Sequence, residues 1–299
     1  MDNLLLDYLI SQGNTEIIKK PNSKHVLINA DSLNFLKNFP ANSINLVITD
    51  PPYNIGLNYG LYRDNLPKQN YMDFCKNWLT ECSRILTNSG TLYLISYPEI
   101  CAYLLPFLSD TLKLNFKRWL TWHYPTNIGH SRMNFTRSQR CILFYTKSND
   151  YIFHKEKILQ HYKNPEVKKV KDRLINGSKG RGSYDLLRFN DLIELNKIID
   201  SQDLLQFLES IEKFEGLPDV LDYNLLKNVS KKRMKGHPCQ LPFGLLRVLI
   251  NVSSDSDMWI LDPFAGTFTV SAVAAEMGRN SIGIELNPEY VKMGKERLK

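Results

Sequence analysis

The sequence predicts an open α/β fold built around a mostly parallel sheet, and two patterns support this prediction. Short, nearly continuous apolar runs recur along the chain, and several of them end abruptly in a carboxylate. Such runs are typical of strands that are buried on both faces of a parallel sheet. Segments with helical spacing lie between or after the runs, and strands that alternate with helices form open α/β sheets.

Four of the expected strands place an acidic residue at their carboxyl end. The strands and their acidic residues are 25–31 (Asp31), 44–50 (Asp50), 258–262 (Asp262) and 281–285 (Glu285). Ligands bind outside the carboxyl ends of the strands in open α/β sheets. We therefore expect the four carboxylates to line one crevice, although each of them alone would also suit a turn or a helix cap.

Three further strands and four helices complete the predicted sheet domain. The additional strands are expected at 91–97, 116–123 and 140–147, so that the sheet has seven strands in all. Helices are expected at 32–39, 71–86, 270–277 and from Pro288 onward. Glycine-containing stop signals follow the second and third of these helices, and a proline at the first helical position favours a helix start.

The composition changes after Lys147, and we expect an inserted, partly helical recognition region at 148–235. Residues 155–181 hold nine Lys/Arg against three Asp/Glu, whereas residues 185–222 hold ten Asp/Glu against three Lys/Arg. The acidic part has helical spacing of Leu and Ile over 191–214, which we interpret as a solvated structural insertion.

The rest of the chain, 1–147 and 236–299, is then one catalytic and cofactor-binding domain. The net charge of +7 suits a polyanionic partner, although many basic proteins bind no nucleic acid. The candidates for contacts with a polyanion are Lys168, Lys169, Lys171, Arg173, Lys179, Arg181, Lys231, Lys232 and Arg233. The alternative is that these side chains form two solvated basic faces.

The cysteines and the hydropathy pattern indicate a soluble protein of the cytoplasm. The five cysteines are odd in number and none forms a Cys-x-x-Cys pair, so neither a disulfide framework nor a zinc site is expected. The apolar run Leu4–Ile10 is short and interrupted by Asp7, which makes it a poor signal peptide. No run approaches the ~18 apolar residues of a membrane span, so no membrane partner is expected.

The segment Asp50-Pro51-Pro52-Tyr53 follows a strand and offers groups that can activate an exocyclic amine. Such an amine on a nucleobase is a poor nucleophile because its lone pair is delocalised into the ring. The Asp50 carboxylate and the Pro51 carbonyl can accept hydrogen bonds from both N–H groups, which favours a tetrahedral nitrogen. Tyr53 offers a flat face for an extruded base, a contact worth roughly 1–3 kcal/mol. The same four residues would also suit a rigid turn.

The segment Asp262–Thr267 lies between a strand and a helix and suits an adenosine-containing cofactor. Gly266 lets a ligand approach the backbone closely. Glu285 follows Asp262 by 23 residues and ends the next strand, where an acidic residue can bind ribose hydroxyls. The segment differs from the Gly-x-Gly-x-x-Gly fingerprint and the sequence has no P-loop, which argues against NAD binding and nucleotide hydrolysis.

These segments resemble the motifs of bacterial amino-group DNA methyltransferases. Thr49–Asn54 (TDPPYN) is similar to the family's catalytic motif, and Leu261–Thr267 (LDPFAGT) is similar to its cofactor motif. Further similar segments are Ala30-Asp31, Gly236–Pro242 (GHPCQLP) and the C-terminal GIELNPEYVKMGKERL. The catalytic motif comes first and the cofactor motif lies near the C-terminus, an order that resembles the β class of restriction-modification enzymes.

The resemblance implies a circularly permuted S-adenosylmethionine-dependent methyltransferase fold and assigns roles by position. Asp50, Pro51, Pro52 and Tyr53 would receive the target base, and no metal is implied. The residues that would hold S-adenosylmethionine are Ala30, Asp31, His237, Pro238, Gln240, Asp262, Pro263, Phe264, Ala265, Gly266, Thr267 and Glu285. In this set Asp31 would contact the adenine, Phe264 would pack on it and Glu285 would bind the ribose.

Two positions depart from the family's pattern. Thr267-Phe268 stands where the family has Ser-Gly, so the Phe268 side chain either crowds the cofactor site or points into the core. Ser138-Gln139-Arg140 stands where the family often has Ser-His-Glu, and nothing in the sequence explains this difference.

The implied reaction is direct transfer of a sulfonium methyl group to N6 of adenine in double-stranded DNA, with the target base flipped out of the duplex. Methylation of cytosine N4 is the nearest alternative, but the family's cytosine enzymes more often have Ser at the position of Asp50. Methylation of RNA or of a protein amide is a further alternative, as is a catalytically inactive DNA-binding homologue. The resemblance also implies a cognate restriction endonuclease and a second copy of the chain as partners.

Overall fold

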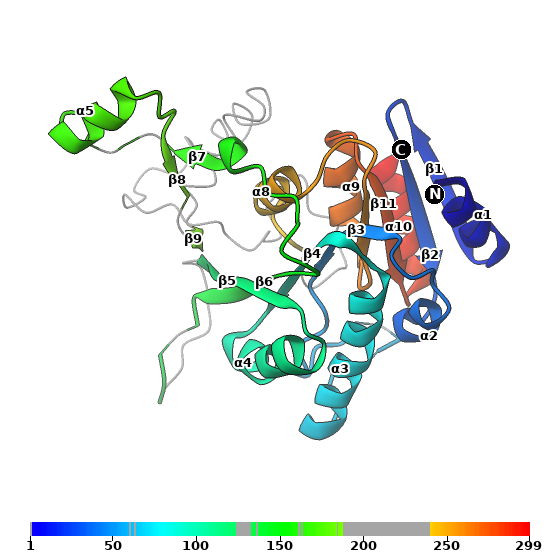
Figure 1. Ribbon diagram of the computed structural model, residues 1–299. Helices are drawn as coiled ribbons and strands as arrows, with labels where there is room; N and C mark the ends of the chain where they lie inside the picture. Colours follow the sequence, from blue (N-terminus) through cyan, green and yellow to red (C-terminus); the bar gives the residue numbers. More distant parts are fainter. Residues whose placement is uncertain are drawn as a thin grey trace, which may run out of the picture.

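The computed structural model describes residues 2–59, 61–62, 64–123, 133–135, 137–160, 162, 164–183, 185–187 and 240–299. A central sheet is covered by helices on both faces (Figure 1). The helical stretch predicted at 191–214 and the basic candidates Lys231, Lys232 and Arg233 lie outside the described residues.

The central sheet has nine strands in the order β1-β2-β11-β10-β3-β4-β6-β5-β9. Their bounds are β1 Thr15–Lys20, β2 Ser23–Asn29, β3 Ile44–Thr49, β4 Leu86–Ser96, β5 Asn115–His123, β6 Gln139–Thr146, β9 Leu186–Leu187, β10 Trp259–Asp262 and β11 Asn280–Glu285. Strands β2, β11, β10, β3 and β4 are parallel neighbours, whereas β1 and β6 pair antiparallel with the strands beside them. The predicted α/β class with a mostly parallel sheet is confirmed.

All seven predicted strands are present, but the predicted number of strands is too low because the sheet is longer at both edges. β1 (TEIIKK) mixes polar and apolar residues and is half-buried along most of its length, so it lacks the continuous apolar run of the inner strands. β9 contributes two residues, which pair in parallel with Thr121 and Trp122 of β5.

Seven helices of the described chain belong to the sheet domain. Their bounds are α1 Asp2–Ser11, α2 Ser32–Lys37, α3 Lys68–Ile85, α4 Pro98–Pro106, α8 Phe243–Ser253, α9 Thr269–Glu276 and α10 Pro288–Leu298. Of these, α2, α3, α9 and α10 were predicted and α1, α4 and α8 were not. None of the helices in the described part of the chain has both the length and the apolar character that crossing a bilayer requires.

The helices form two layers because successive side chains of a strand point to opposite faces of the sheet. In β3, Val47 packs with the core beneath helices α1 to α4, whereas Leu46 and Ile48 pack with the core beneath α8 and α9. Both cores reach the carboxyl ends of the parallel strands, so the loops that leave these ends start from a well-packed base.

An arm that carries α5 (Lys168–Ile175) extends away from the sheet domain (Figure 1). A short antiparallel pair, β7 (Leu159–Gln160) with β8 (Arg181–Gly182), connects the arm to the rest of the molecule. The chain that leads into the arm packs on the sheet domain, since the ring of Phe153 stacks on Phe144 of β6 with centroids 5.8 Å apart.

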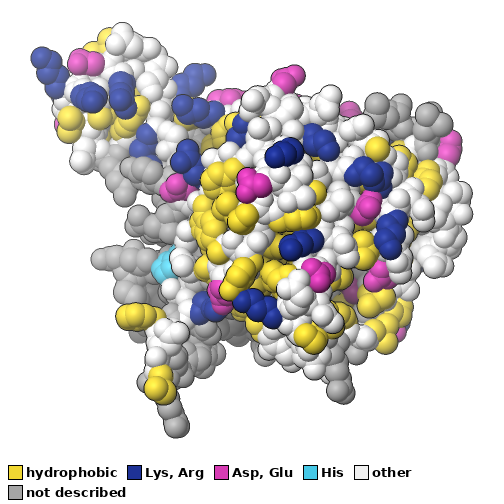
Figure 2. Space-filling model, turned by 60° about the horizontal axis from the view of Figure 1, so that its bottom comes forward, with side chains coloured by type: hydrophobic (Ala, Val, Ile, Leu, Met, Phe, Trp, Pro, Cys, Tyr) yellow, Lys and Arg dark blue, Asp and Glu magenta, His cyan; other side chains and the backbone are white. Residues whose placement is uncertain are grey.

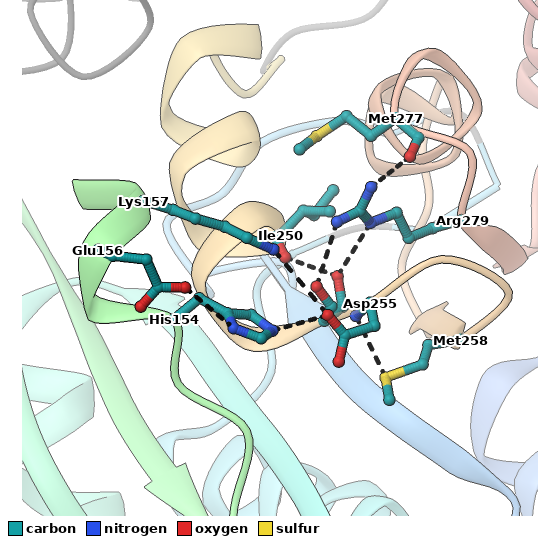
Figure 3. Close-up of polar contacts among 9 residues, drawn as sticks. His154, Glu156, Lys157, Ile250, Asp255, Met258, Met277 and Arg279 are labelled. Carbon is teal, nitrogen blue, oxygen red and sulfur yellow. Dashed lines mark hydrogen bonds and ion pairs between the residues drawn. The ribbon is translucent and has the colours of Figure 1, made fainter. Parts of the chain in front are cut away.

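A polar cluster fixes this leading segment to the loop before β10 (Figure 3). His154 Nε2 lies 2.7 Å from Asp255 Oδ1, and His154 Nδ1 lies 3.3 Å from Glu156 Oε1. The backbone N–H of His154 donates to the carbonyl of Val252 at 2.7 Å. Because these residues precede β10, the chain enters the arm at the amino end of that strand. It returns from the arm to β9, which pairs with Thr121 and Trp122 near the carboxyl end of β5.

Candidate active site

The four carboxylates at the ends of β2, β3, β10 and β11 line one pocket. Asp31, Asp50, Asp262 and Glu285 all belong to its wall, as do the loops that follow β3 and β10. The four strands are consecutive neighbours in the sheet, which brings their carboxyl ends together. The expectation of one crevice at this edge is therefore confirmed.

Asp31 has both of the roles that its position allows. Its Oδ1 accepts a hydrogen bond from the backbone N–H of Asn34 at 2.9 Å, so it caps α2, and its side chain also lines the pocket. Ala30, the other predicted residue of this segment, is not part of the pocket wall. Its backbone N–H donates to the Glu285 carbonyl at 3.1 Å and so joins the ends of β2 and β11.

The loop after β10 wraps its backbone around two carboxylates. Asp262 Oδ1 accepts from the backbone N–H of Phe264 at 3.1 Å. Gly266 has φ 51°, a left-handed conformation that favours glycine, and its N–H donates to Glu285 Oε2 at 2.8 Å. The other oxygen of Glu285 accepts from the Asn287 N–H at 2.8 Å. The hydrogen bond from Gly266 to Glu285 thus fixes the loop between β10 and α9 to the carboxyl end of β11.

An aromatic cluster supports the same loop. The ring of Phe264 packs edge-on against Trp78 and Phe74 of α3, with centroid distances of 5.2 and 5.9 Å. Phe264 and Phe74 also line the pocket. One wall of the pocket is therefore apolar and aromatic, while the strand ends supply carboxylates.

Burial makes this pocket unfavourable for negative charge. Burial is the main reason that the pKa of Asp262 is raised to about 8; the hydrogen bond from the N–H of Phe264 opposes this rise, and the neighbouring carboxylates of Asp50 and Glu285 contribute to it. Burial likewise raises the pKa of Glu285 to about 7, although backbone N–H groups lower it. A ligand that carries positive charge would favour the ionised form of both groups.

The Phe268 side chain points into the core, not into the pocket. It is fully buried and packs with Leu27, Ala272 and Leu298. The ring lies against two glycines: a Cβ on Gly283 would lie 2.6 Å from Phe268 Cδ1, and a Cβ on Gly294 would lie 2.6 Å from Phe268 Cγ. The sequence left open whether Phe268 crowds the cofactor site or points into the core, and the structure places its ring in the core.

The loop that follows β3, for which a catalytic role is predicted, is tightly packed. The Asp50 side chain is 12% exposed, and the Tyr53 hydroxyl donates to Asp50 Oδ1. The ring of Tyr53 is buried, with its centroid 4.6 Å from that of Tyr97 and 4.7 Å from the guanidinium carbon of Arg140. Stacking of a base on Tyr53, as predicted, would therefore require the ring to move from these neighbours.

A second acidic residue, which sequence reasoning did not identify, fixes the chain beyond Tyr53. Asp64 is fully buried, and its two carboxylate oxygens accept from the backbone N–H groups of Asn54 at 2.6 Å and Ile55 at 3.1 Å. Asn54 adopts φ 59° and exchanges two hydrogen bonds with the backbone of Leu66, at 2.6 and 2.7 Å. Asp64 thus holds the loop as a closed turn beside the pocket.

Most of the predicted cofactor residues lie together. Those that line the pocket are Asp31, Gln240, Asp262, Pro263, Phe264, Ala265, Gly266, Thr267 and Glu285. His237 and Pro238 lie outside the described residues. The wall also contains residues that sequence reasoning missed: Ser32, Tyr59, Leu61, Tyr62, Phe74, Leu241, Thr269, Val270, Ile284, Leu286, Asn287 and Tyr290. Several of these residues are next to a predicted site residue in the sequence, and this position could have indicated that they line the pocket.

The basic candidates that the structure describes lie on the arm and not at the pocket. We use the name α5 cations for Lys168, Lys169, Lys171 and Arg173, all of which are exposed. Figure 2 shows Lys and Arg side chains gathered on this projecting part of the molecule. Lys179 is exposed and Arg181 half-buried, whereas Lys231, Lys232 and Arg233 lie outside the described residues.

Comparison with known proteins gives relatives along almost the whole chain. The family described as DNA methylase, of the N6/N4 type, matches residues 44–296. The type II methyltransferase M.HpaI of Haemophilus parainfluenzae is 30% identical over 272 residues, which are 91% of this chain and 73% of that protein. The DNA adenine methyltransferase YhdJ of Escherichia coli is 29% identical over 280 residues, which are 93% of this chain and 83% of that protein.

Solved structures share the fold at low sequence identity. The cytosine-N4-specific PvuII DNA methyltransferase superposes with a TM-score of 0.62 at 18% identity and covers 94% of this chain and 90% of its own. The M1.HpyAVI complex with S-adenosylmethionine gives a TM-score of 0.58 at 17% identity and covers 91% of this chain and 98% of its own.

Proposed function

Because this chain belongs to the N6/N4 family of DNA methylases, we propose that it transfers a methyl group from S-adenosylmethionine to N6 of adenine in double-stranded DNA. The observation that carries the proposal is the position of Asp50, whose carboxylate lines the same pocket as Asp262 and Glu285. A carboxylate acceptor at this point supports adenine over cytosine, since the resembled cytosine enzymes more often have Ser there.

The residues of the pocket fit S-adenosylmethionine. Glu285 at the end of β11 would bind the ribose, and Phe264 offers an apolar face to the adenine. The raised pKa values of Asp262 and Glu285 mean that the pocket holds more negative groups than it can ionise without a cation. When bound, S-adenosylmethionine supplies a methyl group activated by its positively charged sulfur.

The residues of the catalytic loop then act on the acceptor amine. The Asp50 carboxylate accepts one N–H of the amine, and the backbone carbonyl of Pro51 accepts the other, so the nitrogen lone pair turns toward the methyl group. The Tyr53 hydroxyl donates to Asp50 in this structure, and the amine of the target base would replace it as the donor to that carboxylate. The hydroxyl of Tyr71 donates to the Pro52 carbonyl at 2.7 Å and keeps the loop backbone in place during this exchange.

DNA is proposed to lie along the side of the molecule that joins the pocket to the arm. The α5 cations would contact phosphates, which fix the position of a duplex but do not read its sequence. A duplex hides the amino nitrogen from the pocket, so the target base must be flipped out. A cognate restriction endonuclease and a homodimer remain predictions from the family resemblance.

Single-turnover methylation of a duplex that contains the target site tests the proposal. The site is first identified by mapping methylated bases in the genome of a host that expresses the protein. Asp50→Ala should lower the rate by on the order of a hundredfold to a thousandfold while cofactor affinity survives, because the missing hydrogen bond forms only as the amine rehybridises. Asp110→Ala removes an exposed carboxylate away from the pocket and serves as the matched control.

The outcomes separate the candidate functions. Methylation at cytosine N4 would refute the choice of adenine but keep the enzyme class. Near-normal methylation by Asp50→Ala would refute the catalytic role of the loop. Failure of folded wild-type protein to bind S-adenosylmethionine at millimolar concentration would favour a catalytically inactive homologue.

A further inference from the structure

A buried arginine lies behind the catalytic loop. Arg140 is the second residue of β6, and its side chain is 5% exposed. Its Nη1 lies 3.8 Å from Asp50 Oδ2, and its guanidinium carbon lies 4.7 Å from the centroid of the Tyr53 ring. Arg140 is not part of the pocket wall. It therefore contacts the catalytic loop from outside the pocket.

The sheet topology explains how this arginine reaches Asp50. β6 runs antiparallel to β4, so β6 begins at the edge where the parallel strands β3 and β4 end. Arg140 is paired with Trp122 of β5, and its guanidinium carbon lies 5.4 Å from that ring and 5.6 Å from the ring of Tyr97. Aromatic faces attract a guanidinium, and they hold it beside the carboxylate.

The positive charge of Arg140 forms an ion pair with the carboxylate of Asp50. A buried cation is stable only when it is paired, and Asp50 supplies a carboxylate to the guanidinium within the part of the chain that the structure describes. Among the titratable groups in the described part of the chain, those that face Asp50 are Arg140 from β6, Tyr53 from its own loop and Asp262 from β10. Burial raises the pKa of Asp50, and Arg140 and the bond from Tyr53 oppose this rise. Asp262 is a like charge when it is ionised, so Arg140 is the cation among these groups.

We propose that Arg140 is a positioning residue for methyl transfer, which keeps Asp50 in its carboxylate form and holds Tyr53 beside it. This inference rests on the proposed function. A protonated Asp50 would present one oxygen as a donor and could not accept the amine at that oxygen. Arg140 acts through Asp50 and does not touch the base. The residue that departs from the family's Ser-His-Glu segment thus acquires a specific task in this chain.

The pH profile of single-turnover methylation tests the proposal, with saturating S-adenosylmethionine and the target duplex from pH 5.5 to 8.5. Arg140→Met should move the acid limb of the profile upward by about one to three pH units, because an opposite charge within 4–6 Å lowers a carboxyl pKa by that amount. Arg140→Lys should restore the midpoint. Arg137→Met, which removes another arginine that stacks on Tyr97, should leave the midpoint at the wild-type value.

A second measurement does not depend on turnover. Carbon-13 NMR of the Asp50 carboxyl, assigned by its loss in Asp50→Asn, should show the same upward shift in Arg140→Met without DNA. Arg140→Gln replaces Arg140→Met in both experiments if circular dichroism shows that the Met variant is unfolded. Equal midpoints in wild type and the neutral variants, with a rate reduced equally at every pH, would overturn the proposal and leave a structural role. If wild-type protein methylates no DNA, the proposed function fails, and the NMR titration still decides whether Arg140 holds Asp50 ionised.

Discussion

Replacement of Gly294 by alanine tests whether Phe268 fills the core between two glycines. Gly294 is buried within α10, and a Cβ there would lie 2.6 Å from Phe268 Cγ and 3.0 Å from Phe268 Cβ. A Gly→Ala change inside an exposed helix stabilises by about 1 kcal/mol. Overpacking of a filled core costs about 1–3 kcal/mol. Because the crowded atoms belong to the root of an enclosed ring, we expect a net decrease of about 1–2 kcal/mol in the free energy of unfolding.

Urea unfolding of four proteins measures this effect and its cause. The proteins are wild type, Gly294→Ala, Phe268→Gly and the double variant. Phe268→Gly places a glycine at a residue with φ 59° and removes the ring, so in that background Gly294→Ala should become stabilising. The reversal of sign identifies the ring as the cause. Stabilisation by Gly294→Ala in the wild-type background would refute the packing argument.

Two further predictions concern the ligands of the protein. S-adenosylmethionine affinity should rise between pH 6 and 8.5, because Glu285 with a pKa of about 7 and Asp262 with a pKa of about 8 ionise in this window and favour a cation. Calorimetry in two buffers of different ionisation enthalpy should detect proton release on binding, smaller in Glu285→Gln; no proton release would contradict the charge argument. Replacement of the α5 cations by Gln should weaken DNA binding and reduce the slope of log affinity against log salt by about 0.9 for each phosphate that the variant no longer neutralises. Exposed Lys19 and Lys292, replaced in the same way, are the control, and an unchanged slope in the α5 variant would identify a solvated face.

The central strands were predictable because burial on both faces requires nearly continuous apolar runs. The same rule explains what was missed. α8 (FGLLRVLINVS) is mostly apolar, and a run of that kind cannot be assigned to helix or strand from periodicity alone. β1 lies at the edge of the sheet and carries lysines, so it has no pattern of a buried strand. Helix α4 begins and ends with a proline, and prolines in a sequence are typical of turns.

The pocket was predictable where its residues follow strands and not where they come from distant contacts. Asp31, Asp50, Asp262 and Glu285 each lie at the carboxyl end of a strand or within two residues of it, and the parallel sheet brings them together. Arg140 is 90 residues from Asp50 in the sequence. It lies beside Asp50 because β6 runs antiparallel to β4 and begins at the edge where β3 ends. No spacing rule connects such residues in a single sequence.

The loop between β10 and α9 accommodates Phe268 because the residue adopts a left-handed backbone conformation and its ring packs in the core. Phe268 has φ 59° and ψ 40°, left-handed values that cost a non-glycine residue roughly 1–2 kcal/mol. Full burial of a Phe side chain contributes about 1.5–3 kcal/mol, which offsets that cost. The space for the ring exists only because Gly283 on β11 and Gly294 on α10 have no Cβ. With the ring directed into the core, the pocket side of the loop stays open to a ligand, and the N–H of Gly266 reaches Glu285 Oε2.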